Sequence, residues 1–273
     1  MLPFFGFLAI FLIVPTVTVI AGAFQDGETG GFTLGNIQAL GSSAALTTLK
    51  NSLMLSASTA LLGGILGAVL AYLIVSLGPR SILRRTTLSI AGVLAQFGGV
   101  TLAFAWIALI GYSGLLTLAL QDWPGINIYG TGWLYGLKGL IVVYTYFQVP
   151  LMVIVFTPAI EGLRPQLKEA AVNLGATNLQ YWRMVGIPLL TPAFLGSVLL
   201  LFANAFAAYA TAAILVSQGN PIVPLLIRSA LTSEVLLGQQ NLGFALATLM
   251  IVVVAIVMGL YALLLRRTSR WLR

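Results

Sequence analysis

Long runs of apolar residues alternate along this chain with short polar segments. Six runs reach the length of about 20 mostly apolar residues that a helix needs to cross a bilayer. None of the six contains Asp, Glu, Lys or Arg, and their polar positions are Asn, Gln, Ser, Thr and Tyr. The pattern therefore predicts an all-α integral membrane protein with six transmembrane helices. The predicted spans are approximately 2–23, 52–77, 86–111, 139–160, 189–216 and 243–265.

The composition agrees with a membrane protein and excludes several kinds of chemistry. Charged residues make up 7% of the chain, against about 25% in an average soluble domain, so lipid must cover most of the surface. The sequence has no Cys and no His, which excludes disulfides, Cys/His metal sites and Ser-His or Cys-His catalytic pairs. We therefore expect no metal site and no enzymatic activity in this chain.

The basic residues predict the orientation of the spans. With both termini in the cytoplasm, ten Lys and Arg residues lie inside and three outside, as the positive-inside rule requires. This distribution explains the net charge of +7 without a nucleic-acid partner. The first run has no basic flank, which favours a retained span over a signal peptide. The inner residues are Arg80, Arg84, Arg85, Arg164, Lys168, Arg183, Arg266, Arg267, Arg270 and Arg273, and the outer ones are Lys50, Lys138 and Arg228, on the same side as Trp123 and Trp133.

Between the fourth and fifth runs lies a polar segment, 161–190, that is much longer than an ordinary connection. Pro165 suits the first turn of a helix, and Gly175 can take the left-handed conformation that ends one. Thr177 followed by Gln180 matches a capping box, which starts a second helix. The segment predicts two short helices with a glycine hinge, docked on another protein or lying on lipid headgroups. The apolar face of the first helix comprises Leu167, Ala170, Ala171 and Leu174.

One string within this segment resembles the EAA motif of permease subunits of binding-protein-dependent ABC importers. The family pattern is Glu-Ala-Ala, three residues, Gly, nine residues, then Ile-x-Leu-Pro, and this chain departs from it by two conservative apolar replacements. The resemblance covers nearly the whole chain and is greatest to the spermidine/putrescine-type permeases, through 32–36 and 51–52. The matching residues are Glu169, Ala170, Ala171, Gly175, Val185, Ile187 and Pro188.

The resemblance implies a type I ABC importer permease fold in one domain, residues 1–273, of a bacterial or archaeal cytoplasmic (inner) membrane. The expected partners are two ATP-binding subunits, a second permease subunit, an external solute-binding protein and the bilayer. The motif residues would dock a coupling helix on the ATPase, and Pro188 would set the turn into the fifth span. Because the chain has no G-x-x-x-x-G-K-[ST] string, ATP and Mg²⁺ belong to the partner ATPase. The implied solute is a polyamine, with thiamine, ferric iron, sulfate or another small solute as alternatives.

The alternative of another class is an ion-coupled secondary transporter, and a passive channel is a further one. Secondary transporters usually keep charged residues inside the membrane, and the six spans have none. The sequence also shows neither the carbonyl-filter signature nor the ring of charge that is typical of a channel. Polar residues within the spans either line a solute pathway or form hydrogen bonds between helices. Gly63, Gly64 and Gly67 predict a close helix contact. The pathway candidates are Asn204, Tyr209, Gln96, Trp106, Tyr144 and Gln148.

Overall fold

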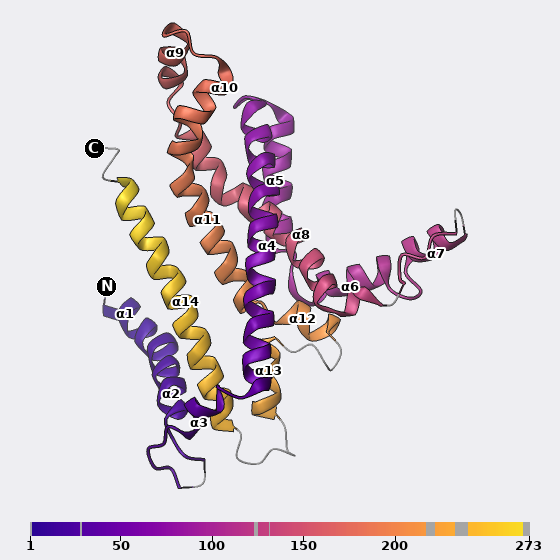
Figure 1. Ribbon diagram of the computed structural model, residues 1–273, viewed down its shortest axis with the longest axis vertical. Coiled ribbons are helices and arrows are strands. Elements are labelled where there is room, and N and C mark those ends of the chain that lie inside the picture. The colour runs from indigo at the N-terminus through magenta and orange to yellow at the C-terminus, as the bar shows by residue number, and fades with distance from the viewer. Residues whose placement is uncertain are drawn as a thin grey trace. The chain divides into compact units, whose positions relative to one another are not determined.

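A computed structural model describes residues 2–27, 29–122, 125–130, 132–216, 222–232 and 240–269, and these ranges are almost wholly helical (Figure 1). They include six helices long and apolar enough to cross a membrane, which confirms the predicted fold class. Of the residues named above, Trp123, Arg270 and Arg273 lie outside the described residues.

The chain divides into two compact units, of which the first comprises Met1–Met54 and Val216–Ile256. Buried Ala45, Val223 and Leu246 form its apolar core. The Asn36 side chain donates hydrogen bonds to the carbonyl of Ala23, the last residue of α2, and to that of Gln25, just beyond the helix. Its helices are α1 (Leu2–Leu8), the π-helical η1 (Ala9–Ile13), α2 (Val14–Ala23), α3 (Gly35–Ala39), α13 (Val223–Thr232) and the first parts of α4 (Ser43–Ser76) and α14 (Gln240–Ser269).

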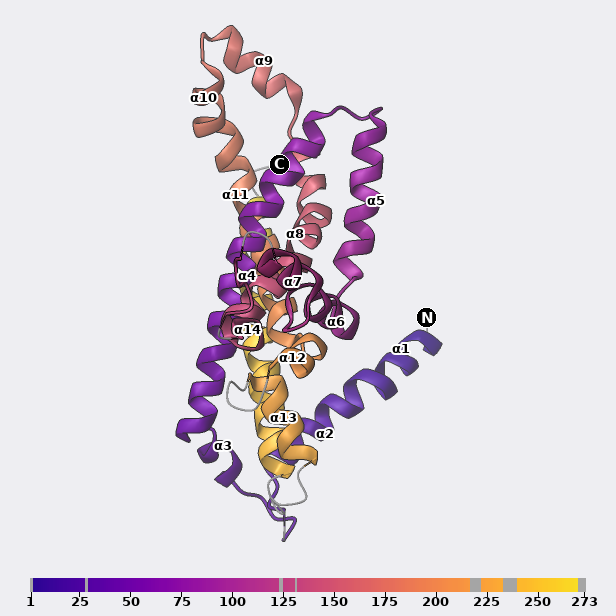
Figure 2. The ribbon, with the colours of Figure 1, turned by 90° about the vertical axis from the view of Figure 1, so that its right-hand side faces the viewer.

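The second unit comprises Leu55–Leu215 and Val257–Arg273 and contains most of the membrane-spanning bundle. Its core joins α4, α8 and α11 through residues such as Ile74, Met152 and Leu201, and α5 packs along α8 (Figure 2). Besides the ends of α4 and α14, its helices are α5 (Ile82–Gln96), α6 (Gly99–Ile110), α7 (Leu115–Asp122), η2 (Trp133–Tyr135), α8 (Leu137–Glu161), α9 (Pro165–Asn173), α10 (Asn178–Tyr181), the π-helical η3 (Trp182–Gly186), α11 (Ile187–Ala207) and α12 (Ala210–Leu215).

Three glycines of α4 bring the helices of this unit into close contact. A Cβ atom on Gly63 would lie 2.5 Å from the Cβ of Gln148, and one on Gly67 would lie 2.4 Å from that of Met152, both on α8. A Cβ on Gly64 would lie 2.8 Å from a methyl group of Val198 on α11. The predicted close packing at these glycines is therefore confirmed.

Two of the predicted spans are wrong as continuous helices. The run 86–111 breaks after Gln96, because Phe97 and Gly98 have non-helical backbone and Gly99, the first residue of α6, has a left-handed φ of +71°. The third membrane-crossing segment is Gly99–Asp122. The run 189–216 breaks at Ala208, which has an extended backbone. A run of apolar residues indicates that a segment lies in lipid, but it does not show where the helix is interrupted. The fourth span, 139–160, agrees with α8, whereas α4 begins ahead of its predicted start, at Ser43.

Candidate functional site: an exposed hairpin and two helix breaks

The first helix of the segment 161–190 forms as its sequence predicts. It begins at Pro165 and is closed by a Schellman motif. The N–H of Gly175 donates to the carbonyl of Val172 at 2.8 Å, and the N–H of Ala176 donates to that of Ala171 at 2.9 Å. Gly175 has a φ of +81°, so the left-handed conformation expected of it is confirmed.

The second helix begins as expected, at the capping box, but it does not end at Pro188, where the resemblance implied a turn into the fifth span. Thr177 and Gln180 form the predicted capping box, with the Gln180 Oε1 accepting from the Thr177 N–H at 2.7 Å. From Asn178 the helix runs through η3 and α11 without interruption, so Pro188 does not mark a turn into the membrane. The N–H of Ile187 donates to the carbonyl five residues back, and this wider turn accommodates a proline that has no N–H to offer.

The motif residues fall into two groups. Glu169, Ala170 and Gly175 are exposed on the hairpin formed by α9 and α10, and Ala171 beside them is partly exposed. The other group, Val185, Ile187 and Pro188, lies where η3 passes into α11, with Val185 half-buried and its two companions exposed. The structure therefore brings the motif's first half together at the tip of the hairpin and places its second half on the helix leading away from it.

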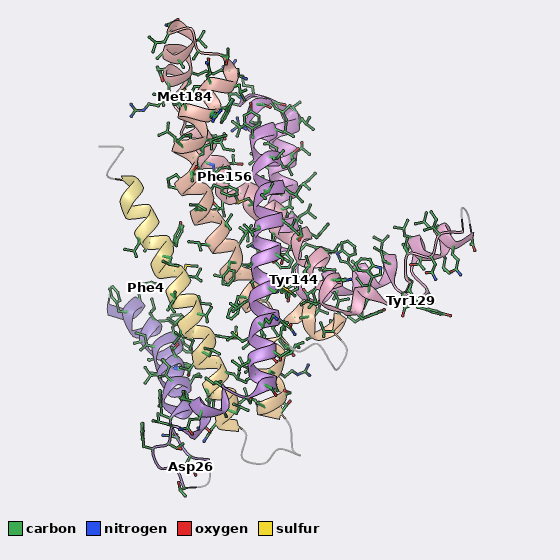
Figure 3. The ribbon with its side chains drawn as sticks, in the orientation of Figure 1. Phe4, Asp26, Tyr129, Tyr144, Phe156 and Met184 are labelled. Carbon is green, nitrogen blue, oxygen red and sulfur yellow. The ribbon has the colours of Figure 1, made fainter. Side chains whose placement is uncertain are left out.

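Exposed apolar side chains flank the glycine hinge. Leu174 is 88% exposed and Leu179 is 77% exposed, one on either side of Gly175, and Met184 is exposed farther along (Figure 3). Such residues gathered at one tip, next to charged Lys168 and Glu169, are typical of a surface that another macromolecule covers.

A cavity of about 560 Å³ lies where this hairpin joins the bundle, between α4, α8 and the start of α11. Its lining is aromatic and aliphatic, and it includes Tyr72 and Trp182, whose rings meet edge to face at 5.2 Å. No local sequence pattern predicts this cavity, because its walls come from α4, α8 and the continuous helical stretch 178–207, which are separate segments of the chain.

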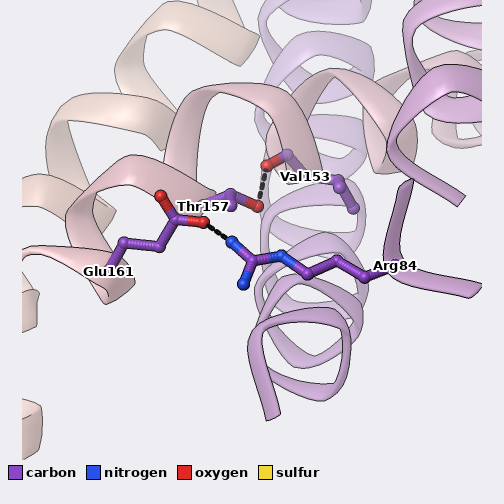
Figure 4. Close-up of polar contacts among 4 residues, drawn as sticks. All are labelled: Arg84, Val153, Thr157 and Glu161. Atoms are coloured by element: carbon purple, nitrogen blue, oxygen red, sulfur yellow. Dashed lines mark hydrogen bonds and ion pairs between the residues drawn. The ribbon is translucent and has the colours of Figure 1, made fainter. Parts of the chain in front are cut away.

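At the base of the hairpin an ion pair joins two helix ends. Arg84 in the first turn of α5 donates through Nη2 to Oε1 of Glu161, the last residue of α8 (Figure 4). The Thr157 hydroxyl, one turn before Glu161, donates to the carbonyl of Val153 at 2.6 Å and so has its partner within α8. Sequence reasoning placed Arg84 only among the cytoplasmic charges and missed this contact.

Two of the pathway candidates lie inside the contact between α8 and α11. Tyr144 and Gln148 are fully buried. The Tyr144 hydroxyl donates to the carbonyl of Ala208 at 2.8 Å, and the Gln148 amide donates to that of Leu201 at 2.8 Å (Figure 3 labels Tyr144). Their arrangement is that of interhelical hydrogen bonds, the alternative to a pathway lining.

Three of the other four candidates, Gln96, Asn204 and Tyr209, lie at or near the two helix breaks. Gln96 is exposed at the end of α5, and Tyr209 is half-buried within the break that follows α11. The Thr211 hydroxyl donates to the carbonyl of Gly99 at 3.0 Å, so the two breaks adjoin. Exposed Asn204 lies on α11 just before its break, and half-buried Trp106 on α6 meets Tyr146 edge to face. The structure thus gathers polar and aromatic groups around irregular backbone within the apolar spans.

Comparison with known proteins gives a family match and several relatives. Residues 99–270 match the family described as "Binding-protein-dependent transport system inner membrane component". A ferric transport system permease protein of Actinobacillus pleuropneumoniae is 27% identical over 210 residues, which are 75% of this chain and 29% of that protein. A spermidine/putrescine transport system permease protein of Haemophilus influenzae is 25% identical over 263 residues, which are 94% of this chain and 90% of that protein.

Solved structures share the fold. A chain of a bacterial ABC transporter involved in the import of alginate superposes with a TM-score of 0.76 at 17% identity, covering 98% of this chain and 93% of its own. The same kind of transporter in complex with an alginate-bound periplasmic protein gives a TM-score of 0.77 at 18% identity, with coverages of 97% and 92%. The present chain spans less than a third of the length of the ferric permeases that it matches.

Proposed function

Because the chain belongs to the family of binding-protein-dependent transport system inner membrane components, we propose that it is a membrane-spanning subunit of an ATP-driven importer. Two ATP-binding subunits hold the ATP and Mg²⁺, a second permease subunit completes the pathway, and an external binding protein delivers the solute. The chain lies in a bacterial or archaeal cytoplasmic membrane with both termini in the cytoplasm, the side to which most of its basic residues are assigned.

The hairpin is the observation that carries this proposal. Its exposed Glu169 and Ala170 lie on a short helix that a Schellman motif holds at a fixed angle to the next one. The small side chains of Ala170 and Ala171 allow a groove on another protein to approach the backbone closely. We propose that this tip, with exposed Leu174 and Leu179, docks on an ATP-binding subunit.

The paired helix breaks support the proposed pathway. Irregular backbone at membrane depth is stable only where protein buries it or where it lines a water-filled route. In this chain the breaks at 97–98 and 208–209 adjoin through Thr211 and Gly99, with exposed Gln96 and Asn204 nearby. We assign Gln96, Asn204 and Tyr209 to the pathway, Trp106 to its rim, and Tyr144 and Gln148 to the support behind it.

The solute is a small molecule that the external binding protein selects. A polyamine is the proposed class, because the match to a spermidine/putrescine permease extends over 94% of this chain and 90% of that protein. Ferric, sulfate and thiamine permeases are also relatives. Uptake of labelled putrescine and of ferric iron by cells with and without the intact system separates the two leading classes.

Copurification from mild detergent tests the function. The native chain should recover an ATP-binding subunit, and a Glu169→Lys/Gly175→Trp variant should lose it, because both substitutions alter the exposed tip and neither enters the core. The matched control is Asp122→Lys, which makes the same charge change at an exposed position at the end of α7.

Two results would overturn the proposal. Recovery of no ATP-binding subunit with the native chain would favour an ion-coupled transporter with a hairpin bound to lipid headgroups. Equal recovery with the native chain and the tip variant would place the docking surface elsewhere. Gel filtration and thermal unfolding confirm that each variant has kept its spans folded.

A further inference from the structure

The ion pair between Arg84 and Glu161 joins two charges that their own helices disfavour. Arg84 lies in the first turn of α5, where the backbone N–H groups already present partial positive charge, and Glu161 ends α8, where the carbonyls present partial negative charge. A helix benefits from the reverse arrangement. Neither charge is therefore placed to stabilise the helix that carries it, and each has the other as its partner.

Arg84 is the more deeply buried of the two side chains, and it therefore depends on Glu161 as its partner. The Arg84 side chain is 14% exposed and the Glu161 side chain is 42% exposed. A largely buried guanidinium is costly to keep without a carboxylate, so the ion pair holds Arg84 at one position against the end of α8. Its sequence neighbour Arg85 is exposed to solvent on the same helix.

The position of the pair connects the hairpin to the helix breaks. Glu161 precedes α9 by a short turn, so it lies at the base of the hairpin. From Arg84, α5 runs along α8 with Leu88 and buried Ala91 against the shared core, and it ends at Gln96 beside the first break. One helix therefore extends from the hairpin's base to the break joined to Thr211.

We propose that the Arg84–Glu161 ion pair is the joint through which a displacement of the hairpin is passed to α5 and along it to the break at 97–98. This inference rests on the proposed importer function. Arg84 and Glu161 are positioning residues, and neither is assigned to the docking tip or to the pathway.

Spin-label distances in the assembled complex test this joint. The chain has no native cysteine, so labels can be introduced without a background. A pair at Gln166→Cys and Phe104→Cys reports the hairpin against α6, and a pair at Val93→Cys and Phe104→Cys reports α5 against α6, all at exposed positions. Labelled chain is diluted with unlabelled chain, and distances are compared before and after trapping with ATP and vanadate.

In the native background both distances should shift on trapping. With Arg84→Glu the hairpin shift should remain and the α5 shift should be lost, whereas Arg85→Glu, with the same change in net charge, should keep both. The exchange of charges in Arg84→Glu/Glu161→Arg should restore the α5 shift. Arg84→Gln is measured alongside, because it removes the charge without placing two carboxylates together.

The outcomes separate this inference from the function on which it rests. If the native complex recovers no ATP-binding subunit or shows no shift in the hairpin, the importer proposal fails. If the native complex shows both shifts and a folded Arg84→Glu or Arg84→Gln chain keeps the full α5 shift, the joint is overturned while the importer function stands.

Discussion

Single positions in this protein determine how closely the helices of the second unit approach. Gly67 of α4 faces the backbone of α8, where an added Cβ would lie 2.7 Å from the carbonyl oxygen of Val149 as well as against Met152. A backbone oxygen cannot rotate aside as a side chain does. The α4–α8 contact therefore depends on the absence of a single methyl group.

We expect Gly67→Ala to destabilise the chain by about 1–3 kcal/mol, because the added methyl group overpacks this contact. The matched control is Gly92→Ala in α5, where nothing lies within 4 Å of the added methyl group. Thermal unfolding in detergent should show a lower midpoint for Gly67→Ala only. Equal midpoints for the two variants would contradict the close contact.

The hydroxyl group of Tyr144 likewise holds two helices together, α8 and the end of α11. It donates to the carbonyl of Ala208, which follows the last residue of α11 and has an extended backbone. Tyr144→Phe removes that donor and should lower stability by about 1 kcal/mol, since the part-buried carbonyl loses its hydrogen bond. Tyr112→Phe, at an exposed tyrosine, is the control, and thermal unfolding of both variants is the measurement. An unchanged midpoint for Tyr144→Phe would show that the carbonyl finds another donor.

At the scale of the elements, the hairpin was predictable and the helix breaks were not. Gly175, Thr177 and Gln180 act on residues within one turn, so their effect can be read from the local sequence. The break at Ala208 has no such local signal, and it adjoins the first break through a hydrogen bond between residues far apart in the chain, Thr211 and Gly99. The prediction of a turn at Pro188 was wrong, because the π-helical turn before the proline lets the helix continue without a break.

The left-handed hinge of the hairpin gives a prediction at this scale. Gly175 has open space around it, so Gly175→Ala is disfavoured only by the backbone, at a cost of roughly 1–2 kcal/mol. Amide hydrogen exchange within 165–181 should become faster, and recovery of the ATP-binding subunit should fall. Gly175→Asn should restore much of the exchange protection and of the recovery, because asparagine tolerates the left-handed conformation better than alanine. Equal behaviour of the two variants would show that the docking surface needs glycine for its size.

At the scale of the whole molecule, α8 is the most enclosed of the six spans. More than half of its apolar window, 56%, is buried within the chain, against 22% for the span that contains α11. The six-span architecture followed from the apolar runs, because membrane-crossing length is encoded continuously in the sequence. Apart from the close contact predicted at Gly63, Gly64 and Gly67, the contacts among the spans were not predictable, because almost every residue in the spans is apolar and the pattern does not distinguish lipid from a neighbouring helix.

The orientation of the chain can be tested by labelling from one side. Gln166→Cys on α9 should react with a membrane-impermeant thiol reagent only after the cells are permeabilised. Gln121→Cys on α7 should react in intact cells, because it lies on the side assigned to the exterior. Both glutamines are exposed, so access to the reagent differs only by side. Labelling in the opposite order would reverse the assigned topology.

The order in which the chain is synthesised determines when each hydrogen bond at the helix breaks can form. The ribosome makes Tyr144 before Ala208, so the donor is present in the membrane when its carbonyl arrives. For the other hydrogen bond the acceptor is made first, because the Gly99 carbonyl is synthesised 112 residues before the Thr211 hydroxyl that donates to it. At roughly 5–20 residues per second, the Thr211 hydroxyl is made on the order of 10 s after Gly99. During this interval the contact between the two breaks is absent, so we expect the first break to pack against α12 only after about three-quarters of the chain has been made.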